Sequence, residues 1–169
     1  MKRIFKALLI GFLSLGCFSL FAENYVAVGK PGKIFDEANT KYVTVNKNNN
    51  ELSVMPGMVF KSFEKSPGWE MIEYSPGLRA FIQENITTVN LQEPQAGSYE
   101  IKNAPGKKVN IEKNGDSWTA SDGAAKFTGT KQGQIIIFPD DTKNPVYSLV
   151  NLGGEGIVIT YDNAVTNFF

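Results

Sequence analysis

The sequence predicts an all-β protein, with a small barrel in its N-terminal half and an antiparallel β-meander or second small barrel in its C-terminal half. Short runs rich in Val, Ile, Phe, Tyr and Thr recur along the chain, and Gly, Pro and Asn separate them at the spacing of a strand plus a turn. Beyond residue 23, no stretch of ten or more residues combines helical periodicity with capping residues. With 169 residues, the chain is long enough for one domain or two small ones.

Residues 1–22 have the layout of a secretory signal peptide. Lys2 and Arg3 provide a basic start, and the apolar run over residues 7–21 is interrupted only by small residues. This run is shorter than the ~20 apolar residues that a transmembrane helix needs. Cleavage after Ala22 would release a soluble protein into the periplasm or cell envelope, which is the location that we expect.

A second processing site competes with the first. Residues 13–17, "LSLGC", resemble the lipoprotein box of bacterial lipoproteins, although Ser14 stands where leucine is usual. Cleavage there would make Cys17 the lipidated N-terminus of an outer-membrane lipoprotein. The other interpretation of Cys17 is that it is one more small apolar residue in the signal peptide, and both remain open.

The charge balance limits the possible partners. The chain has 17 basic and 17 acidic residues, and three of the basic ones but none of the acidic ones lie within residues 1–22. The remainder therefore has 14 basic and 17 acidic residues, a net charge of −3. It lacks the basic stripe that nucleic-acid binding requires and a polybasic patch for anionic lipid. We expect no nucleic-acid partner, and membrane attachment only through a lipid on Cys17.

Two residue types that carry much of enzyme chemistry are missing beyond residue 22. Histidine is absent, and Cys17 is the single cysteine. These absences exclude a Ser-His-Asp triad, a Cys-His nucleophile pair and a zinc site made of His or Cys. They also exclude disulfides beyond the signal peptide, so core packing must hold the fold. We predict a non-enzymatic protein without a cofactor.

The first half, residues 23–91, begins with an alternating run, and Val26 and Val28 lie on one face of it. Further short β-type runs continue to residue 91. The polar segment 92–96, which contains Pro94, indicates a linker between the two halves.

The second half, residues 97–169, has stronger turn signals and predicts a meander of about six strands paired in sequence order. Asn114-Gly115 separates two such strands and suits a tight hairpin turn, because Asn-Gly tolerates positive φ. In the following strand, alternation places Trp118 and Ala120 together on the inward face.

A series of short motifs in the first half carries a family resemblance. Pro56-Gly57 precedes a strand, Gly68-Trp69 opens the next, and Gly77 precedes the last. In this order and spacing the motifs resemble a bacterial SH3-like domain over residues 24–91. The resemblance implies a barrel of about five strands that binds cell-wall peptides or serves as a targeting module beside a wall hydrolase. Phe81 replaces the family's closing tryptophan. Residues 97–169 resemble no family known to us.

Trp69 stands where the resemblance places a tryptophan at the edge of a groove. Strict alternation in "WEMIEY" puts Trp69, Met71 and Glu73 on one face of the strand. The opposite face also mixes apolar and acidic residues, so neither is a clean core face. Such a pattern suits a half-exposed indole ring whose N–H reaches water. The alternative is a plug in the core or between the two halves.

Three further aromatic residues, Phe35, Tyr42 and Tyr74, are candidates to line the same groove. Aromatic grooves of this kind recognise extended peptides. The alternative for each of them is ordinary packing against a neighbouring strand.

The acidic residues do not form a recognisable catalytic pair. A glycosidase needs two carboxylates facing each other across a cleft. Asp140-Asp141 lies between two predicted strands, which indicates a turn held by local hydrogen bonds.

These features predict an exported, non-enzymatic binding protein of the bacterial cell envelope. Its partner would be a peptide, peptidoglycan or an envelope protein, held by the SH3-like domain. The alternative is a small lipocalin-like barrel in the second half that carries an apolar ligand and therefore has an interior cavity. A glycosidase that uses only carboxylates ranks third.

Overall fold

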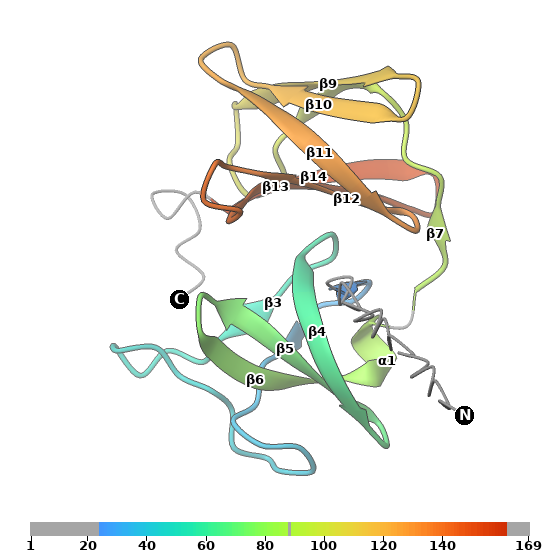
Figure 1. Ribbon diagram of the computed structural model, residues 1–169. Coiled ribbons are helices and arrows are strands. Elements are labelled where there is room, and N and C mark those ends of the chain that lie inside the picture. Colours follow the sequence, from blue (N-terminus) through green and yellow to red (C-terminus); the bar gives the residue numbers. More distant parts are fainter. Residues whose placement is uncertain (1–23, 88, 162–169) are drawn as a thin grey trace, which may run out of the picture.

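The computed structural model describes residues 24–87 and 89–161 and shows a protein built almost entirely of antiparallel β-strands (Figure 1). The predicted all-β class is confirmed. Within these residues one short helix interrupts the strands, and it has four residues. The predicted signal peptide over residues 1–22 and the candidate lipidation site Cys17 lie outside the described residues.

The N-terminal half is a four-stranded sheet with a small accessory pair of strands. The sheet has the order β1-β4-β5-β6, and all its pairings are antiparallel. Its strands are β1 (Asn24–Ala27), β4 (Val59–Ser66), β5 (Trp69–Ser75) and β6 (Leu78–Gln83). The accessory pair is β2 (Gly32–Lys33) with β3 (Ser53–Val54), and helix α1 (Glu84–Thr87) follows β6.

One face of this sheet covers the core of the N-terminal half. Val28, Ile34, Ile72 and Ile82 are fully buried in it. Val26 packs against the same cluster, as the alternation with Val28 predicts. These side chains come from both the sheet and the loops that cross it, so the sheet curls around them.

The C-terminal half is a meander in which each strand pairs with the next one along the chain. It contains seven successive strands where the sequence predicts about six. They are β8 (Gly97–Glu100), β9 (Lys108–Asn114), β10 (Ser117–Ser121), β11 (Lys126–Gln132), β12 (Ile135–Pro139), β13 (Pro145–Leu152) and β14 (Glu155–Thr160). An additional short strand, β7 (Leu91–Gln92), pairs with the end of β13.

The β9–β10 hairpin shows how local sequence directs this meander. Asn114 and Ser117 are cross-strand partners, so only Gly115 and Asp116 form the loop. Gly115 has φ of 60°, a conformation that glycine adopts without steric cost. The positive φ predicted for the Asn-Gly pair therefore falls on its glycine, while Asn114 completes strand β9.

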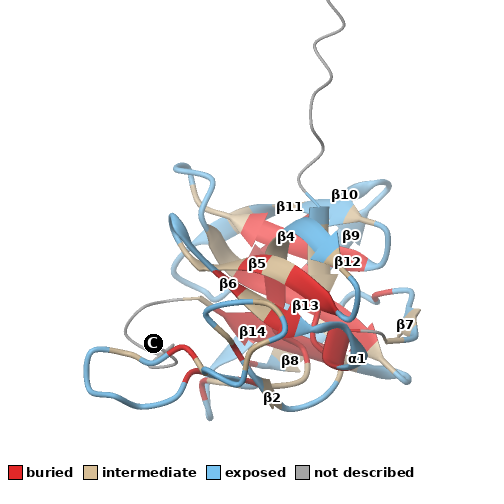
Figure 2. Ribbon diagram, turned by 90° about the horizontal axis from the view of Figure 1, so that it is seen from below, coloured by how far each residue is buried: buried red, intermediate tan, exposed pale blue. Residues whose placement is uncertain are grey.

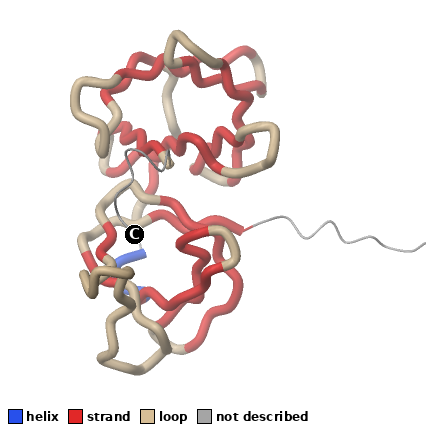
Figure 3. The backbone as a smooth tube through the Cα atoms, turned by 90° about the vertical axis from the view of Figure 1, so that its left-hand side faces the viewer, coloured by secondary structure: helices blue, strands red, loops and turns tan. Residues whose placement is uncertain are grey.

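The two ends of the meander meet and close it into a barrel, which is visible as a ring of strands in Figure 3. Ile101, just after β8, forms a parallel bridge with Val158 of β14. The Asn103 side chain continues this contact. Its amide nitrogen donates to the Thr160 carbonyl at 2.7 Å, and its amide oxygen accepts from the Thr160 N–H at 2.9 Å. One side chain thus takes the place of a strand partner.

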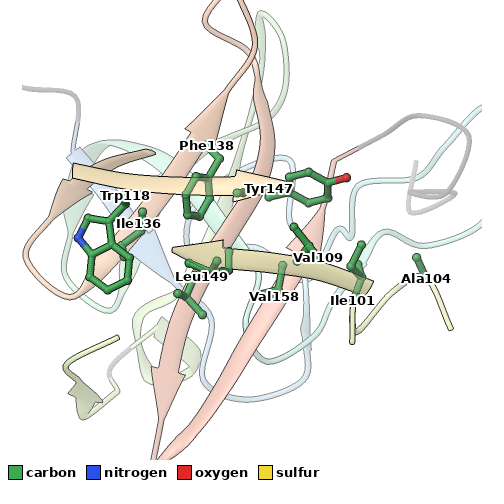
Figure 4. Packing of buried hydrophobic residues seen from close by; sticks show 11 residues of the cluster. Ile101, Ala104, Val109, Trp118, Ile136, Phe138, Tyr147, Leu149 and Val158 are labelled. Atoms are coloured by element: carbon green, nitrogen blue, oxygen red, sulfur yellow. The ribbon is translucent and has the colours of Figure 1, made fainter. Parts of the chain in front are cut away.

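Large side chains fill the interior of this barrel (Figure 4). Trp118 is 1 % exposed, and Phe138, Leu149 and Val158 are completely buried. Ala120 is buried in the same cluster, so the inward orientation predicted for Trp118 and Ala120 is confirmed.

A third apolar cluster joins the two halves. Ala27 and Val59 of the N-terminal sheet pack against the outer side of the C-terminal barrel, where the contacting side chains are Ile135, Ile137, Val150, Ile157 and Ile159. In Figure 2 the buried residues lie along the strands, while the connecting loops are largely exposed. The outer face of the barrel is therefore a buried surface at this contact.

Two residues fix how closely the halves approach. Gly57 has φ of +94°, and a Cβ atom there would lie 2.4 Å from Cγ2 of Ile157. The hydroxyl of Tyr161 accepts from the N–H of Val59 and donates to its carbonyl, both at 2.9 Å. It also lies 3.1 Å from the Ser148 hydroxyl. Desolvation at this enclosed position raises the pKa of Tyr161 to about 12.

The segment predicted as a linker, 92–96, is attached to the C-terminal barrel at its start. Gln92 belongs to β7 and pairs with Asn151. The carbonyl of Glu93 accepts a hydrogen bond from the Asn151 side chain at 3.2 Å, and its carboxylate forms an ion pair with Lys131.

Candidate functional site

The two faces of β5 have different environments. Ile72 is completely buried, and Tyr74 packs against the same core cluster. Since side chains alternate along a strand, Trp69, Met71 and Glu73 point to the opposite side of the sheet. We call this opposite side the outer face. Away from the contact between the halves, it is the candidate binding surface of the N-terminal half.

Glu70 lies on the core face, although it is acidic. It is 2 % exposed, and its carboxylate accepts hydrogen bonds from Ser62 Oγ at 2.5 Å and Thr87 Oγ1 at 3.2 Å. Lys65 Nζ lies 3.5 Å away. A buried carboxylate is tolerated when such partners replace water. Glu70 therefore links helix α1 to the sheet. The mixed face of β5 that carries Glu70, Ile72 and Tyr74 is the core face.

Trp69 lies on the outer face but is covered there. The ring of Phe35 meets it edge to face, with the centroids 5.0 Å apart and an interplanar angle of 87°. Such T-shaped pairs are favourable because the positive ring edge faces the negative ring face. Trp69 is consequently 8 % exposed rather than half-exposed as the alternating pattern suggests.

Phe35 is held in place by two backbone bridges. It pairs with Phe81 of β6 on one side and with Val43 on the other. Its N–H and carbonyl both form 2.8 Å hydrogen bonds with Phe81. The segment around Phe35 thus extends the sheet beyond β6, which brings a residue 34 positions earlier in the chain onto Trp69.

Further side chains complete an aromatic surface on the outer face. Met71 and Phe81 are cross-strand partners, so they lie side by side next to Phe35. Phe63 of β4 is 43 % exposed, and the guanidinium carbon of Arg79 lies 3.9 Å from its ring centroid. We define the outer aromatic surface as Phe35, Phe63, Trp69, Met71 and Phe81.

A charged row borders the outer aromatic surface. Lys61, Glu73 and Arg79 are consecutive cross-strand partners on β4, β5 and β6. Glu73 is two residues from Met71 on β5, and Arg79 is two residues from Phe81 on β6, so the charged row lies on the same face as these side chains. The surface therefore combines the exposed ring of Phe63 with charged side chains of both signs.

The other two predicted site residues are placed differently. Tyr42 is 70 % exposed and lies in the loop that leads to Val43, the bridge partner of Phe35. Tyr74 lies on the core face, away from Trp69. Of the four candidates, the structure brings Phe35 and Trp69 into contact, places Tyr42 one residue away from the Phe35 pairing, and separates Tyr74.

The sequence reasoning did not single out Phe63, Phe81 or Arg79 as site residues. Alternation in "LRAFI" does place Arg79 and Phe81 on one face, which is a usable signal. Phe63 is harder to assign because the β4–β5 register shifts between Ser62 and Lys65. Such an irregularity turns the side chain in a way that alternation alone does not predict.

The acidic turn of the C-terminal half has the local role predicted for it. Asp140 Oδ1 accepts from the N–H groups of Thr142 and Asn144, both at 2.9 Å, and from the Thr142 hydroxyl at 2.7 Å. The hydrogen bond from the Thr142 side chain is the main cause of a pKa below the usual value for Asp140. This carboxylate stabilises its own loop.

Comparison with known proteins finds no family model, no curated protein and no solved structure that matches this chain. Among residues 24–87 and 89–161, no three His, Cys, Asp or Glu side chains are grouped so that they could hold a metal ion. The helix in this part of the chain is too short to cross a membrane.

Proposed function

We propose that this protein is an exported, non-enzymatic binding protein of the bacterial cell envelope. Its outer aromatic surface would hold a peptide, a cell-wall polymer or a protein partner. The proposal joins the signal-peptide layout of residues 1–22 and the SH3-like resemblance of residues 24–91 to the geometry of this surface.

The observation that carries the proposal is the partly exposed ring of Phe63 with Arg79 stacked on it. Exposed aromatic rings beside charged groups are typical of binding surfaces, because the rings supply contact area and the charges supply orientation. On the same outer face, Phe35 and Trp69 form an edge-to-face pair.

The carrier alternative has less support. A carrier of an apolar ligand needs an interior cavity of some hundreds of cubic ångströms. In the C-terminal barrel, the interior between the strands is filled by the side chains of Trp118, Phe138 and Leu149. This packing favours the binding-protein interpretation.

The test is retention of the purified protein on insoluble peptidoglycan and on immobilised envelope extract. We expect Phe63→Ala to lower retention at least tenfold, because Phe63 is the most exposed ring of the surface. Leu78→Ala is the matched control, since Leu78 is 52 % exposed on β6 and lies outside the outer aromatic surface. Equal retention of the wild type and Phe63→Ala would refute the proposed surface.

Export and anchoring need a separate measurement. The intact mass of the protein isolated from the membrane and periplasmic fractions distinguishes the two processing sites. A chain that begins at Glu23 indicates a soluble exported protein, whereas acyl mass on Cys17 indicates a lipoprotein. A chain that begins at Met1 in the cytoplasm would contradict export.

A further inference from the structure

A pocket opens at one end of the C-terminal barrel, on a different part of the chain from the outer aromatic surface. Its volume is about 340 Å³. The loop after β8, the loop between β10 and β11, and the ends of β13 and β14 contribute its lining. Turns of an antiparallel meander alternate between two ends of a barrel, which is why these separate segments meet there.

The floor of the pocket is apolar and firmly packed. Ile101 and Tyr147 belong to the interior cluster and are 2 % and 6 % exposed. In Figure 4 the hydroxyl of Tyr147 points away from the packed side chains. Phe127 contacts the Tyr147 ring edge to face, with the centroids 5.6 Å apart. The position of the Tyr147 hydroxyl is therefore set by the barrel core.

Asp122 contributes a fixed negative charge. One of its carboxylate oxygens accepts from the N–H groups of Ala124 and Ala125, both at 2.9 Å. The other accepts from the Tyr147 hydroxyl at 2.8 Å. The hydrogen bond from Ala125 is the main cause of a lowered pKa for Asp122. All these donors are neutral, so they orient the carboxylate without compensating its charge.

Two neighbouring lysines contribute positive charge to the same pocket. Lys107 and Lys108 are both exposed and both line it. Within the described residues, neither forms an ion pair, whereas Lys33, Lys65, Lys126 and Lys131 do. Each ammonium group has three N–H donors that can turn toward a ligand.

We propose that this pocket binds a small amphoteric molecule that carries both a carboxylate and an ammonium group, such as an amino acid or a short peptide. The ligand's carboxylate would meet Lys107 and Lys108, and its ammonium group would meet Asp122. A simple anion would pair with the lysines but leave Asp122 without a partner, and a simple cation would pair with Asp122 but face the two lysines. A molecule with both charges matches all three charged groups of the lining. The pocket volume is at the lower end of the range for small-molecule sites.

The probe for the test is L-alanyl-L-alanine, whose two charged ends are separated by a short apolar body. Its binding is measured by isothermal titration calorimetry and by NMR shift perturbation, with acetate and ethylamine as single-charge controls. We expect saturable binding of the dipeptide, with shifts centred on residues 101–108 and 122–125. Acetate and ethylamine should bind at least tenfold more weakly.

The variants assign the charges separately. The double replacement Lys107→Gln with Lys108→Gln should weaken dipeptide binding at least tenfold, and both positions are exposed, so the fold tolerates the change. Asp122→Asn should weaken binding of the dipeptide but strengthen that of acetate. Lys47→Gln, an exposed lysine of the N-terminal half, is the matched control and should change nothing.

Three results would overturn the proposal. They are the absence of saturable dipeptide binding, dipeptide binding that the double lysine variant leaves unchanged, and acetate binding as tight as that of the dipeptide. Since Phe63→Ala leaves this pocket intact, failure of the envelope-binding proposal would not affect the outcome.

Discussion

The Tyr161 hydroxyl forms hydrogen bonds with both the N–H and the carbonyl of Val59, a residue 102 positions earlier in the chain. It therefore fastens the last described residue of the C-terminal barrel to a central strand of the N-terminal sheet. The surrounding contact is apolar, with Ala27, Ile137 and Ile159 nearby. Because a buried polar group without a partner is costly, this hydroxyl matters more than an exposed one would.

Tyr161→Phe should therefore destabilise the protein. The change keeps the ring but leaves the backbone groups of Val59 without this partner, at a cost of about 2 kcal/mol in the free energy of unfolding. Urea denaturation followed by circular dichroism measures the effect. Tyr99→Phe is the matched control, because its hydroxyl bonds the Gln95 carbonyl at an exposed position. That loss should stay below about 1 kcal/mol, and equal effects of the two changes would contradict this role of Tyr161.

The same residue predicts how stability depends on alkaline pH. The folded protein holds the pKa of Tyr161 at about 12, above its ordinary value, because the phenolate is poorly solvated there. At a pH between the ordinary tyrosine pKa and this raised pKa, the unfolded chain has lost the phenolic proton of Tyr161, while the folded chain retains it. The free energy of unfolding therefore falls as pH rises through this range. Denaturation midpoints at pH 9, 10 and 11 should fall progressively in the wild type. In Tyr161→Phe the decline should be smaller, and parallel curves would refute the prediction.

Gly57→Ala should loosen the contact between the two halves. The new Cβ would meet Ile157 at 2.4 Å, and the backbone would have to keep φ at +94° or change it. We expect a loss of about 3 kcal/mol, from left-handed backbone strain and overpacking together. Gly77→Ala isolates the backbone part, because Gly77 has φ of +75° and no atom within 4 Å of the added Cβ. If both changes cost the same, Ile157 does not limit the approach of the halves.

Glu70 provides a test of the buried polar contact. Glu70→Ala removes the acceptor of Ser62 and Thr87 and should cost about 2–3 kcal/mol. Glu70→Gln keeps an acceptor oxygen and should cost about 1 kcal/mol. Thermal and urea denaturation of the two variants measure the difference. Glu112→Ala serves as the exposed control, and its ion pair with Lys126 should contribute little. A Glu70→Ala variant as stable as the wild type would show that the carboxylate is dispensable.

The parts of the fold that follow from local sequence could be predicted well. Gly115 permits a hairpin turn, and the alternation around Trp118 fixes which face points inward, because both effects act within a few residues. The all-β class and the sequential meander follow from many such signals. Their agreement along the chain makes the C-terminal half the more predictable one.

The candidate site was less predictable because it depends on contacts between distant segments. Trp69 is buried because Phe35 is brought onto it by pairing with Phe81, and nothing near Trp69 in the sequence signals this. Glu70 looks like a surface residue until Ser62 and Thr87 supply its hydrogen bonds. Phe63 reaches the outer aromatic surface beside a register shift. In each case the partner, rather than the residue itself, determines the environment.

The closure of the C-terminal barrel has a consequence for how the protein opens. Strands β12, β13 and β14 are joined along their full lengths, whereas β8 and β14 are joined by the Ile101–Val158 bridge, a 2.8 Å bond from Lys102 N–H to the Val158 carbonyl, and the Asn103 side chain. Opening at the β8–β14 boundary breaks few hydrogen bonds and leaves the rest of the meander paired. Amide hydrogens there should exchange with solvent through local opening, while those of β12 and β13 should wait for global unfolding. The boundary between β8 and β14 is therefore the weakest one in the barrel. In mild denaturant the barrel should open there, beginning at Asn103, and form an open sheet before the other strands separate.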